Sequence, residues 1–311
     1  MLTPAESAGA AHGGPGPRRC AVWGSPIEHS LSPVLHRAAY AVLGLHGWTY
    51  ERREVDERSF GPALDELDGV WRGLSLTMPL KEVGLQRAAA ASETARATGG
   101  ANTLVRHDDG WHAHNTDVYG IQAALAEVLP TGAELTTALV VGSGATARSA
   151  LAALAGVGVR HVTFMVRGAV RAETASQAER SGLTVDVVPW GTWPCCDVVV
   201  STVPPSEVEG LDTFPRPSHV GSGAVLDVVY GSGETPLERV AVSRGWCRAR
   251  GVDMLLHQAT EQVRLMTGRP APVEAMREAL DHVRTASSDG ARDQAPPSSA
   301  RSQALPTTSG P

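Results

Sequence analysis

Thr137-Ala-Leu-Val-Val-Gly142-Ser-Gly144-Ala-Thr-Ala147 is the stretch of sequence that decides the predicted fold. The aliphatic residues before Gly142 indicate a buried strand, and the Ala-rich residues after Gly144 indicate a helix. A further apolar strand is expected at 161–166, so the glycines lie in a strand–turn–helix–strand unit. Units of this kind predict a mostly parallel sheet that is covered by helices.

The glycine turn also has the spacing Gly-x-Gly-x-x-Ala, which is typical of dinucleotide-binding sites. Its glycines permit a tight turn and close backbone approach, and the helix N-terminus faces the pyrophosphate. We therefore expect the residues of this turn to bind a dinucleotide. They are Gly142, Ser143, Gly144, Ala145, Thr146 and Ala147. The alternative is a structural glycine turn that binds nothing.

The end of the following strand indicates which dinucleotide is bound. A site for NAD would place a carboxylate there to hold the ribose 2′-OH. This chain has Arg167 and Arg171 instead, with no acid before Glu173. Two guanidinium groups suit a 2′-phosphate by charge and by bidentate geometry, so NADP is the predicted cofactor. The alternative is that both arginines are simply solvated at the start of a helix.

On both sides of this unit, short strands alternate with helices. The sequence predicts an α/β fold with two domains: a discontinuous N-terminal α/β substrate domain and a Rossmann-like NADP-binding domain. Two late helices have no strands of their own to cover, so we expect them to return to the first domain. The expected boundaries are 20–118 plus 251–286 for the substrate domain and 119–250 for the NADP-binding domain.

The sequence also predicts a hairpin, a helix and the character of the two ends of the chain. Asp108-Asp109-Gly110 predicts a hairpin between strands at 102–106 and 111–115. A helix is expected from Pro33 to Leu43, with Ser32 as its cap. Residues 1–19 and 287–311 are poor in large apolar side chains, and we expect both segments to be disordered.

Composition excludes several classes of protein. The net charge is -6 with both signs mixed, which argues against nucleic-acid binding. No run of 18 apolar residues predicts a membrane span, and the N-terminus lacks the apolar region of a secretory signal. The four cysteines show neither a disulfide framework nor CxxC metal spacing, which favours a cytoplasmic protein. The sequence does not distinguish a monomer from a homodimer.

Lys81 is the only lysine among 27 Lys and Arg residues. Arginine replaces lysine as a surface charge, but its guanidinium does not give up a proton, so a single retained lysine suggests proton chemistry. Chance in an Arg-rich composition is the alternative. Asparagine is equally scarce: Asn102 and Asn115 each stand in an Asn-Thr dipeptide, and Asp117 follows the second.

Taken together, the motifs resemble the shikimate dehydrogenase family over the chain from Cys20 to about Thr285. The segments that carry the resemblance are Gly24-Ser-Pro-Ile-Glu-His-Ser30-Leu-Ser32-Pro33, Thr77-Met-Pro-Leu-Lys81, Gly100-Ala-Asn102-Thr, Asn115-Thr-Asp117, Leu226-Asp-Val-Val-Tyr230 and Gly251-Val-Asp-Met-Leu-Leu-His-Gln258. The resemblance implies reversible, NADPH-dependent reduction of 3-dehydroshikimate to shikimate, a step of chorismate and aromatic amino acid biosynthesis, without a metal.

The resemblance also implies roles for individual residues. Lys81 and Asp117 would form the acid/base pair. The residues expected to bind the substrate are Ser30, Ser32, Thr77, Asn102, Tyr230 and Gln258. Thr202, Val203 and Gly251 are expected on the cofactor side. Helix capping remains open for Ser32, and a turn-forming role remains open for Asn102.

This chain departs from the family pattern at a few positions. Ser75 stands where the family usually has asparagine, and Val166-Arg167-Gly168 replaces the usual Asn-Arg-Thr. These changes concern substrate affinity and cofactor selectivity. Two other functions stay open: a quinate/shikimate dehydrogenase that prefers NAD, and a catalytically silent protein that senses NADP.

Overall fold

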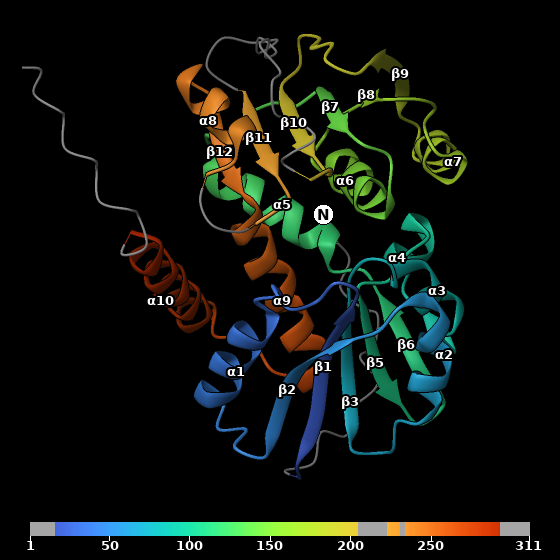
Figure 1. The fold of residues 1–311 in the computed structure, drawn as a ribbon. Helices are drawn as coiled ribbons and strands as arrows, with labels where there is room; N and C mark the ends of the chain where they lie inside the picture. The colour runs from blue at the N-terminus through green and yellow to red at the C-terminus, as the bar shows by residue number, and fades with distance from the viewer. Residues whose placement is uncertain (1–15, 205–222, 231–233, 293–311) are drawn as a thin grey trace, which may run out of the picture.

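The structure is a computed structural model that describes residues 16–204, 223–230 and 234–292. Two six-stranded sheets form the two halves of the molecule (Figure 1). The strand order is β2-β1-β3-β5-β6-β4 in the first sheet and β12-β11-β10-β7-β8-β9 in the second. The predicted α/β fold, with a Rossmann-like second half, is confirmed.

The first sheet mixes parallel and antiparallel strands. Its strands are β1 (Arg18–Gly24), β2 (Trp48–Glu54), β3 (Trp71–Leu76), β4 (Ala90–Ala91), β5 (Thr103–His107) and β6 (Gly110–His114). Strands β5 and β6 pair antiparallel with His107 opposite Gly110, so the predicted hairpin is confirmed. Gly110 has a φ of +128°, a backbone conformation that glycine adopts without strain.

Helices cover both faces of the first sheet. They are α1 (Ser32–Val42), α2 (Glu57–Asp65), α3 (Lys81–Gln86), α4 (Glu93–Thr98), α9 (Gly251–Thr267) and α10 (Val273–Arg292). Because side chains alternate along β1, Val22 packs in the core with α1, α9 and α10, whereas Trp23 packs in the core with α2. The last two helices therefore add to the core of the first half.

The second sheet is parallel throughout. Its strands are β7 (Thr137–Val141), β8 (His161–Val166), β9 (Thr184–Pro189), β10 (Val198–Ser201), β11 (Ala224–Asp227) and β12 (Cys247–Arg250). Three helices pack against this sheet: α6 (Ala145–Gly156), α7 (Ala172–Arg180) and α8 (Pro236–Ser243). Nearly every residue of the central strands is buried, which explains their continuous apolar runs.

Helices α5 (Asp117–Val128) and α9 connect the two halves and cross close to each other (Figure 1). Gly120 of α5 makes the approach possible, because an added Cβ would lie 2.7 Å from the Met254 carbonyl oxygen and 2.9 Å from Gln258 Cβ. We propose that the domain boundaries lie near residues 118 and 251, where these two helices begin.

Three sequence predictions need correction. Helix α1 begins at Ser32 rather than after it, and no side chain caps it, because Leu31 already has helical backbone angles. Strand β1 begins at Arg18, inside the segment predicted to be disordered. Helix α10 continues to Arg292, past the predicted limit at 286, because a helix already docked through Met276 and Leu280 propagates at low cost.

The remaining parts of the predicted disordered ends, 1–15 and 293–311, lie outside the described residues. Among the helices that the structure describes, none combines the length and apolar character needed to cross a bilayer.

Candidate active site

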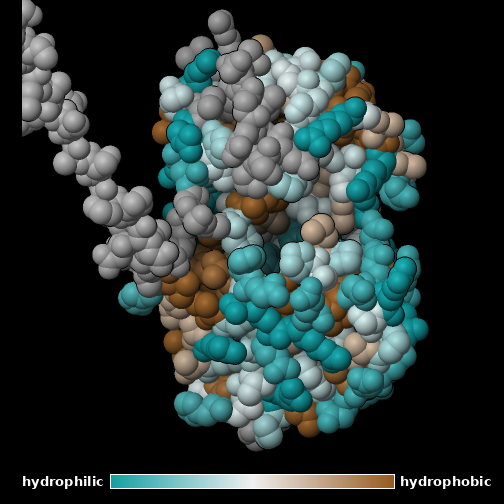
Figure 2. Space-filling model, viewed as in Figure 1, coloured by the Kyte–Doolittle hydropathy of each residue, from teal (hydrophilic) through white to brown (hydrophobic). Residues whose placement is uncertain are grey.

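A cavity of about 340 Å³ lies between the two sheets and is lined from both halves of the molecule. Figure 2 shows this face of the molecule hollowed between its upper and lower parts. The structure places all eight residues of the predicted acid/base and substrate sets on its wall: Ser30, Ser32, Thr77, Lys81, Asn102, Asp117, Tyr230 and Gln258. Thr146 and Gly251 from the predicted cofactor set line the same cavity.

Lys81 and Asp117 meet in this cavity. The Lys81 Nζ donates to Asp117 Oδ2 at 2.6 Å, and their side chains are 13% and 7% exposed. Lys81 Nζ also lies 3.4 Å from Thr146 Oγ1, at the start of helix α6. The ammonium therefore lies at the point where the first half of the molecule meets the glycine turn.

Asp117 is held from several directions. It is the first residue of α5, where the positive end of the helix dipole favours a carboxylate. Its Oδ1 accepts from Asn102 Nδ2 at 2.8 Å, and its backbone N–H donates to Asn115 Oδ1 at 3.1 Å. Both asparagines of the chain thus contact Asp117, Asn102 through the carboxylate and Asn115 through the backbone.

Asn102 connects the pair to helix α9. Besides Asp117, its Nδ2 donates to Thr116 Oγ1 at 2.9 Å and lies 3.3 Å from Gln258 Oε1. Its Oδ1 accepts from the Thr116 backbone N–H at 2.8 Å. Because the side chain is buried and bonds across the fold, its contacts are those of a network and not of a local turn.

Hydroxyl groups also line the cavity. Ser30 and Ser32 are buried, and the Tyr230 hydroxyl hydrogen-bonds with the Ser30 side chain. Burial raises the pKa of Tyr230, so its hydroxyl keeps its proton and stays a donor. Three neutral hydroxyls in one buried region can bind an anionic group by donating hydrogen bonds to it.

A buried polar network that the sequence reasoning missed begins at the cavity wall, which Ser75 and Gln262 both line. Ser75 Oγ accepts from the Tyr50 hydroxyl at 2.6 Å and donates to Gln262 Oε1 at 2.8 Å. His36 Nε2 lies 3.2 Å from the same oxygen, and burial lowers the pKa of His36 to about 3. Gln262 follows Gln258 by one helical turn, and this spacing was the sequence signal for the network.

Ser75, where the family usually has asparagine, thus already forms hydrogen bonds with other side chains of the protein. Its hydroxyl proton goes to Gln262, and one of its lone pairs takes the Tyr50 proton. Gln262 Nε2 in turn donates to Thr103 Oγ1 at 3.0 Å. Ser75 therefore keeps one lone pair for a ligand and can accept a hydrogen bond from a hydroxyl group.

The glycine turn has the geometry that a dinucleotide requires. Gly142 has a φ of +98°, and an added Cβ would lie 2.7 Å from Thr202 Oγ1 and 2.8 Å from Val203 Cγ1. At Gly144 an added Cβ would meet nothing within 4 Å, which leaves open space in front of helix α6. No side chain caps this helix start, so its N–H groups suit a pyrophosphate.

Two other residues of the predicted cofactor set, Arg171 and Thr202, border this turn, whereas Gly251 lies against the segment after β11. Arg171 precedes helix α7, and its backbone N–H lies 3.4 Å from Ser143 Oγ. Thr202 Oγ1 donates to the Val141 carbonyl oxygen at 2.8 Å. An added Cβ at Gly251 would lie 2.6 Å from the Val229 carbonyl oxygen, so this glycine permits a close approach.

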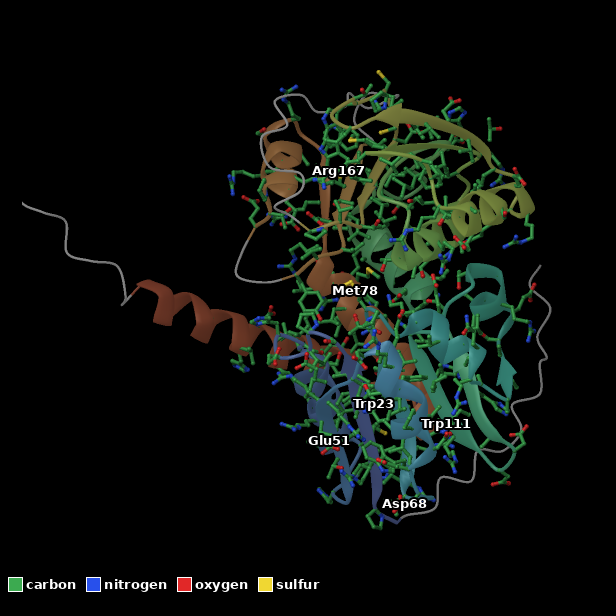
Figure 3. The ribbon with its side chains drawn as sticks, turned by 45° about the vertical axis from the view of Figure 1, so that its right-hand side comes forward. Trp23, Glu51, Asp68, Met78, Trp111 and Arg167 are labelled. Atoms are coloured by element: carbon green, nitrogen blue, oxygen red, sulfur yellow. The ribbon has the colours of Figure 1, made fainter. Side chains whose placement is uncertain are left out.

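Arg167 and Arg171 are exposed where β8 ends. The Arg167 guanidinium lies 4.9 Å from the centre of the Trp190 ring. In Figure 3, Arg167 lies in the half that holds the second sheet, whereas Met78, near Lys81 in the chain, lies at the level between the halves. Arg167 therefore lies in the second half of the molecule, whereas Lys81 lies at the junction of the two halves.

Two sheets with a glycine turn and a buried lysine–carboxylate pair at their junction define a two-domain, dinucleotide-dependent oxidoreductase. Comparison with family models specifies the class further. Residues 22–104 match the shikimate dehydrogenase substrate binding domain, and residues 251–280 match the shikimate 5′-dehydrogenase C-terminal domain.

Individual relatives agree with the family models. The shikimate dehydrogenase (NADP(+)) of Thermosynechococcus vestitus is 32% identical over 84% of this chain and 93% of its own length. The crystal structure of Mycobacterium tuberculosis shikimate dehydrogenase is 38% identical, with a TM-score of 0.75 over 86% of this chain and all of that one.

A third relative was crystallised with ligands. Shikimate 5-dehydrogenase of Thermus thermophilus, in complex with NADP(H) and shikimate, is 29% identical with a TM-score of 0.72. It covers 85% of this chain and 99% of its own. The chain belongs to the shikimate dehydrogenase family.

Proposed function

We propose that this protein is an NADP-dependent shikimate dehydrogenase that interconverts 3-dehydroshikimate and shikimate. The observation that carries the proposal is the 2.6 Å contact between Lys81 Nζ and Asp117 Oδ2 inside a cavity that also reaches the glycine turn. Its relatives are named for this reaction and for this cofactor. A ligand-sensing protein would not need an acid/base pair at this point.

Lys81 is the proposed proton donor and acceptor. When bound, NADPH would supply the hydride to a ring ketone, and NADP⁺ would take it from the corresponding alcohol. During reduction the Lys81 ammonium gives a proton to the ketone oxygen, and during oxidation the amine takes it back. Asp117 holds the ammonium through Oδ2, and its remaining lone pairs can accept from a neighbouring ring hydroxyl.

The rest of the cavity would fix the ring. Hydroxyls of Ser30, Ser32 and Tyr230 would donate to the substrate carboxylate, since Ser32 and Tyr230 both lie beside Ser30. Thr77, Asn102 and Gln258, which line the same cavity, would bind the ring hydroxyls. Anchoring the carboxylate and the hydroxyls keeps the reacting carbon in place, and such positioning supplies a large part of an enzyme's rate.

Arg167 and Arg171 are the proposed ligands of the adenosine 2′-phosphate. Arg167→Ala is expected to lower kcat/KM for NADP⁺ about 10- to 100-fold, because a hydrogen bond to a charged group contributes about 1.5–3 kcal/mol. With NAD⁺ the same change should have little effect. Arg180→Ala, an exposed arginine at the far end of α7, is the matched control. Equal losses with both cofactors would contradict this role.

The deciding experiment measures initial rates with shikimate or quinate and with NADP⁺ or NAD⁺, following the reduced cofactor spectrophotometrically. We expect the highest kcat/KM with shikimate and NADP⁺. Faster turnover with quinate and NAD⁺ would instead identify a quinate/shikimate dehydrogenase. Binding of NADP⁺ without turnover of either acid would identify a nucleotide sensor.

A further inference from the structure

Helix α6 sends two adjacent polar side chains out of the second half of the molecule and into the first. Arg148 and Ser149 are 2% and 0% exposed, and they directly follow Ala147, the last residue of the glycine turn. Burying a guanidinium is costly, and an apolar side chain would pack there at lower cost. The burial of these two polar side chains therefore has to be explained by the contacts that they make.

Arg148 reaches the segment that carries Lys81. Its Nε donates to the Thr98 carbonyl oxygen at 2.6 Å, and its Nη2 lies 3.3 Å from the Gly99 carbonyl oxygen. These carbonyls end helix α4, where a cation is favoured. The same Nη2 donates to Glu82 Oε1 at 2.5 Å, and Glu82 directly follows Lys81 on helix α3.

Ser149 reaches the segment that carries Asp117. Asn115 Nδ2 donates to Ser149 Oγ at 3.0 Å, and Asn115 Oδ1 accepts from the Asp117 backbone N–H at 3.1 Å. Asn115 Nδ2 also donates to the Gly100 carbonyl oxygen at 3.1 Å. One turn of α6 thus contacts the immediate neighbours of both members of the lysine–carboxylate pair.

We propose that Glu82–Arg148 and Asn115–Ser149 are positioning contacts, which hold Lys81 and Asp117 at a fixed offset from the glycine turn. The inference rests on the proposed function. Because α6 begins in that turn, the dinucleotide and the proton donor are located by the same rigid helix. A misplacement of about 1 Å in such an arrangement can lower the rate about 100-fold.

Glu82→Ala is the sharpest test, because Glu82 is half exposed at 47% and its removal opens no cavity in the core. We expect kcat to fall about tenfold, with KM for shikimate and for NADP⁺ within twofold of wild type. The deuterium isotope effect on kcat, measured with shikimate that carries deuterium on the carbon that gives up the hydride, should rise as chemistry becomes slower. Glu82→Gln keeps an oxygen acceptor and should recover part of kcat.

The control is Asp65→Ala, which removes an exposed ion pair of 2.7 Å to Arg87, at the other end of α3. It should leave kcat and the isotope effect unchanged. Ser149→Ala tests the second contact, and its effect should add less than fully to that of Glu82→Ala, since both act on one pair. A wild-type kcat in Glu82→Ala, or a change in KM alone, would overturn the proposal.

A second readout does not depend on activity. Because Lys81 is the only lysine, labelling with ¹⁵Nζ-lysine gives a single side-chain amine signal. The signal should shift in Glu82→Ala and stay in place in Asp65→Ala. An unmoved signal in both would refute the positioning role, whereas absent turnover in the wild-type protein would refute the proposed function alone.

Discussion

The substrate side and the nucleotide side of the cavity are built in opposite ways. On the substrate side, side chains from distant segments bond to one another: Asn102 reaches Asp117 and Gln258, and Ser75 reaches Gln262. On the nucleotide side, the important features are backbone angles and missing side chains, as at Gly142 and Gly144.

The difference teaches which kind of change each side tolerates. A network of mutually bonded side chains fixes charges before the ligand arrives, so replacing one polar group should alter chemistry without unfolding the protein. A turn made of glycines leaves room for the ligand, so adding one methyl group should alter backbone geometry or block the ligand.

The largest effect is expected for Lys81→Arg on the substrate side. Arginine keeps the positive charge beside Asp117 but does not release a proton, so kcat should fall about 10²- to 10⁴-fold. The dissociation constant of NADP⁺, measured by fluorescence titration, should stay near that of wild type. Retained turnover would show that the lysine supplies charge alone, and the contrast between the two sides would lose its main support.

Gly142→Ala and Gly144→Ala form the matching pair on the nucleotide side. At Gly142 the positive φ and the contacts near 2.7 Å predict a loss of about 2–4 kcal/mol in the free energy of unfolding. At Gly144 the φ of -83° and the open surroundings predict wild-type stability with weaker NADP⁺ binding. Urea unfolding measures the stability of each variant, and nucleotide titration measures its affinity for NADP⁺. Equal losses of stability in the two variants would contradict the different roles assigned to Gly142 and Gly144.

His36 gives the smallest effect and concerns the deep part of the substrate side. Its pKa of about 3 in the folded protein lies below the ordinary 6.5, so the unfolded chain binds the proton first on acidification. The stability that neutral His36 contributes is complete above pH 6.5 and decreases as the pH falls toward 3. Between pH 7.5 and 5.0 the expected loss is about 2 kcal/mol.

Urea unfolding at these two pH values compares wild type with His36→Phe. The loss on acidification should be about 2 kcal/mol smaller in the variant. Other buried groups, such as His114 with its pKa lowered to about 4 by burial, titrate in both proteins and cancel. His46→Phe, at an exposed position, is the control. An unchanged pH dependence in His36→Phe would mean that His36 is not coupled to folding.

Local patterns predicted much of the fold. The glycine turn, the strands beside it and the Asp108-Asp109 hairpin follow from residues that are close in the sequence. The short helices α3 and α4, with few apolar positions each, escaped prediction because they are held by their surroundings. Ser32 was misassigned as a helix cap because its neighbour Leu31 takes that position with helical angles.

In the candidate site, too, some residues could be predicted from the sequence and others could not. Lys81 was singled out by composition, and the other residues of the predicted acid/base and substrate sets were indicated by motif resemblance. The network of Ser75 and Gln262 was not, because these two residues are 187 residues apart in the sequence. Arg148 was missed for a related reason: its contacts with Glu82 and Thr98 lie in the other half of the molecule.

The amino-acid sequence alone determined which groups are available: one amine that can exchange a proton, a turn without side chains, and two arginines after the next strand. These are properties of residue types and of local backbone angles, so they need no knowledge of distant contacts. The tertiary structure alone decided that Lys81 and Asp117 lie 2.6 Å apart beside helix α6. That distance depends on how α5 and α9 cross between two sheets, and such long-range packing is not encoded in any single segment.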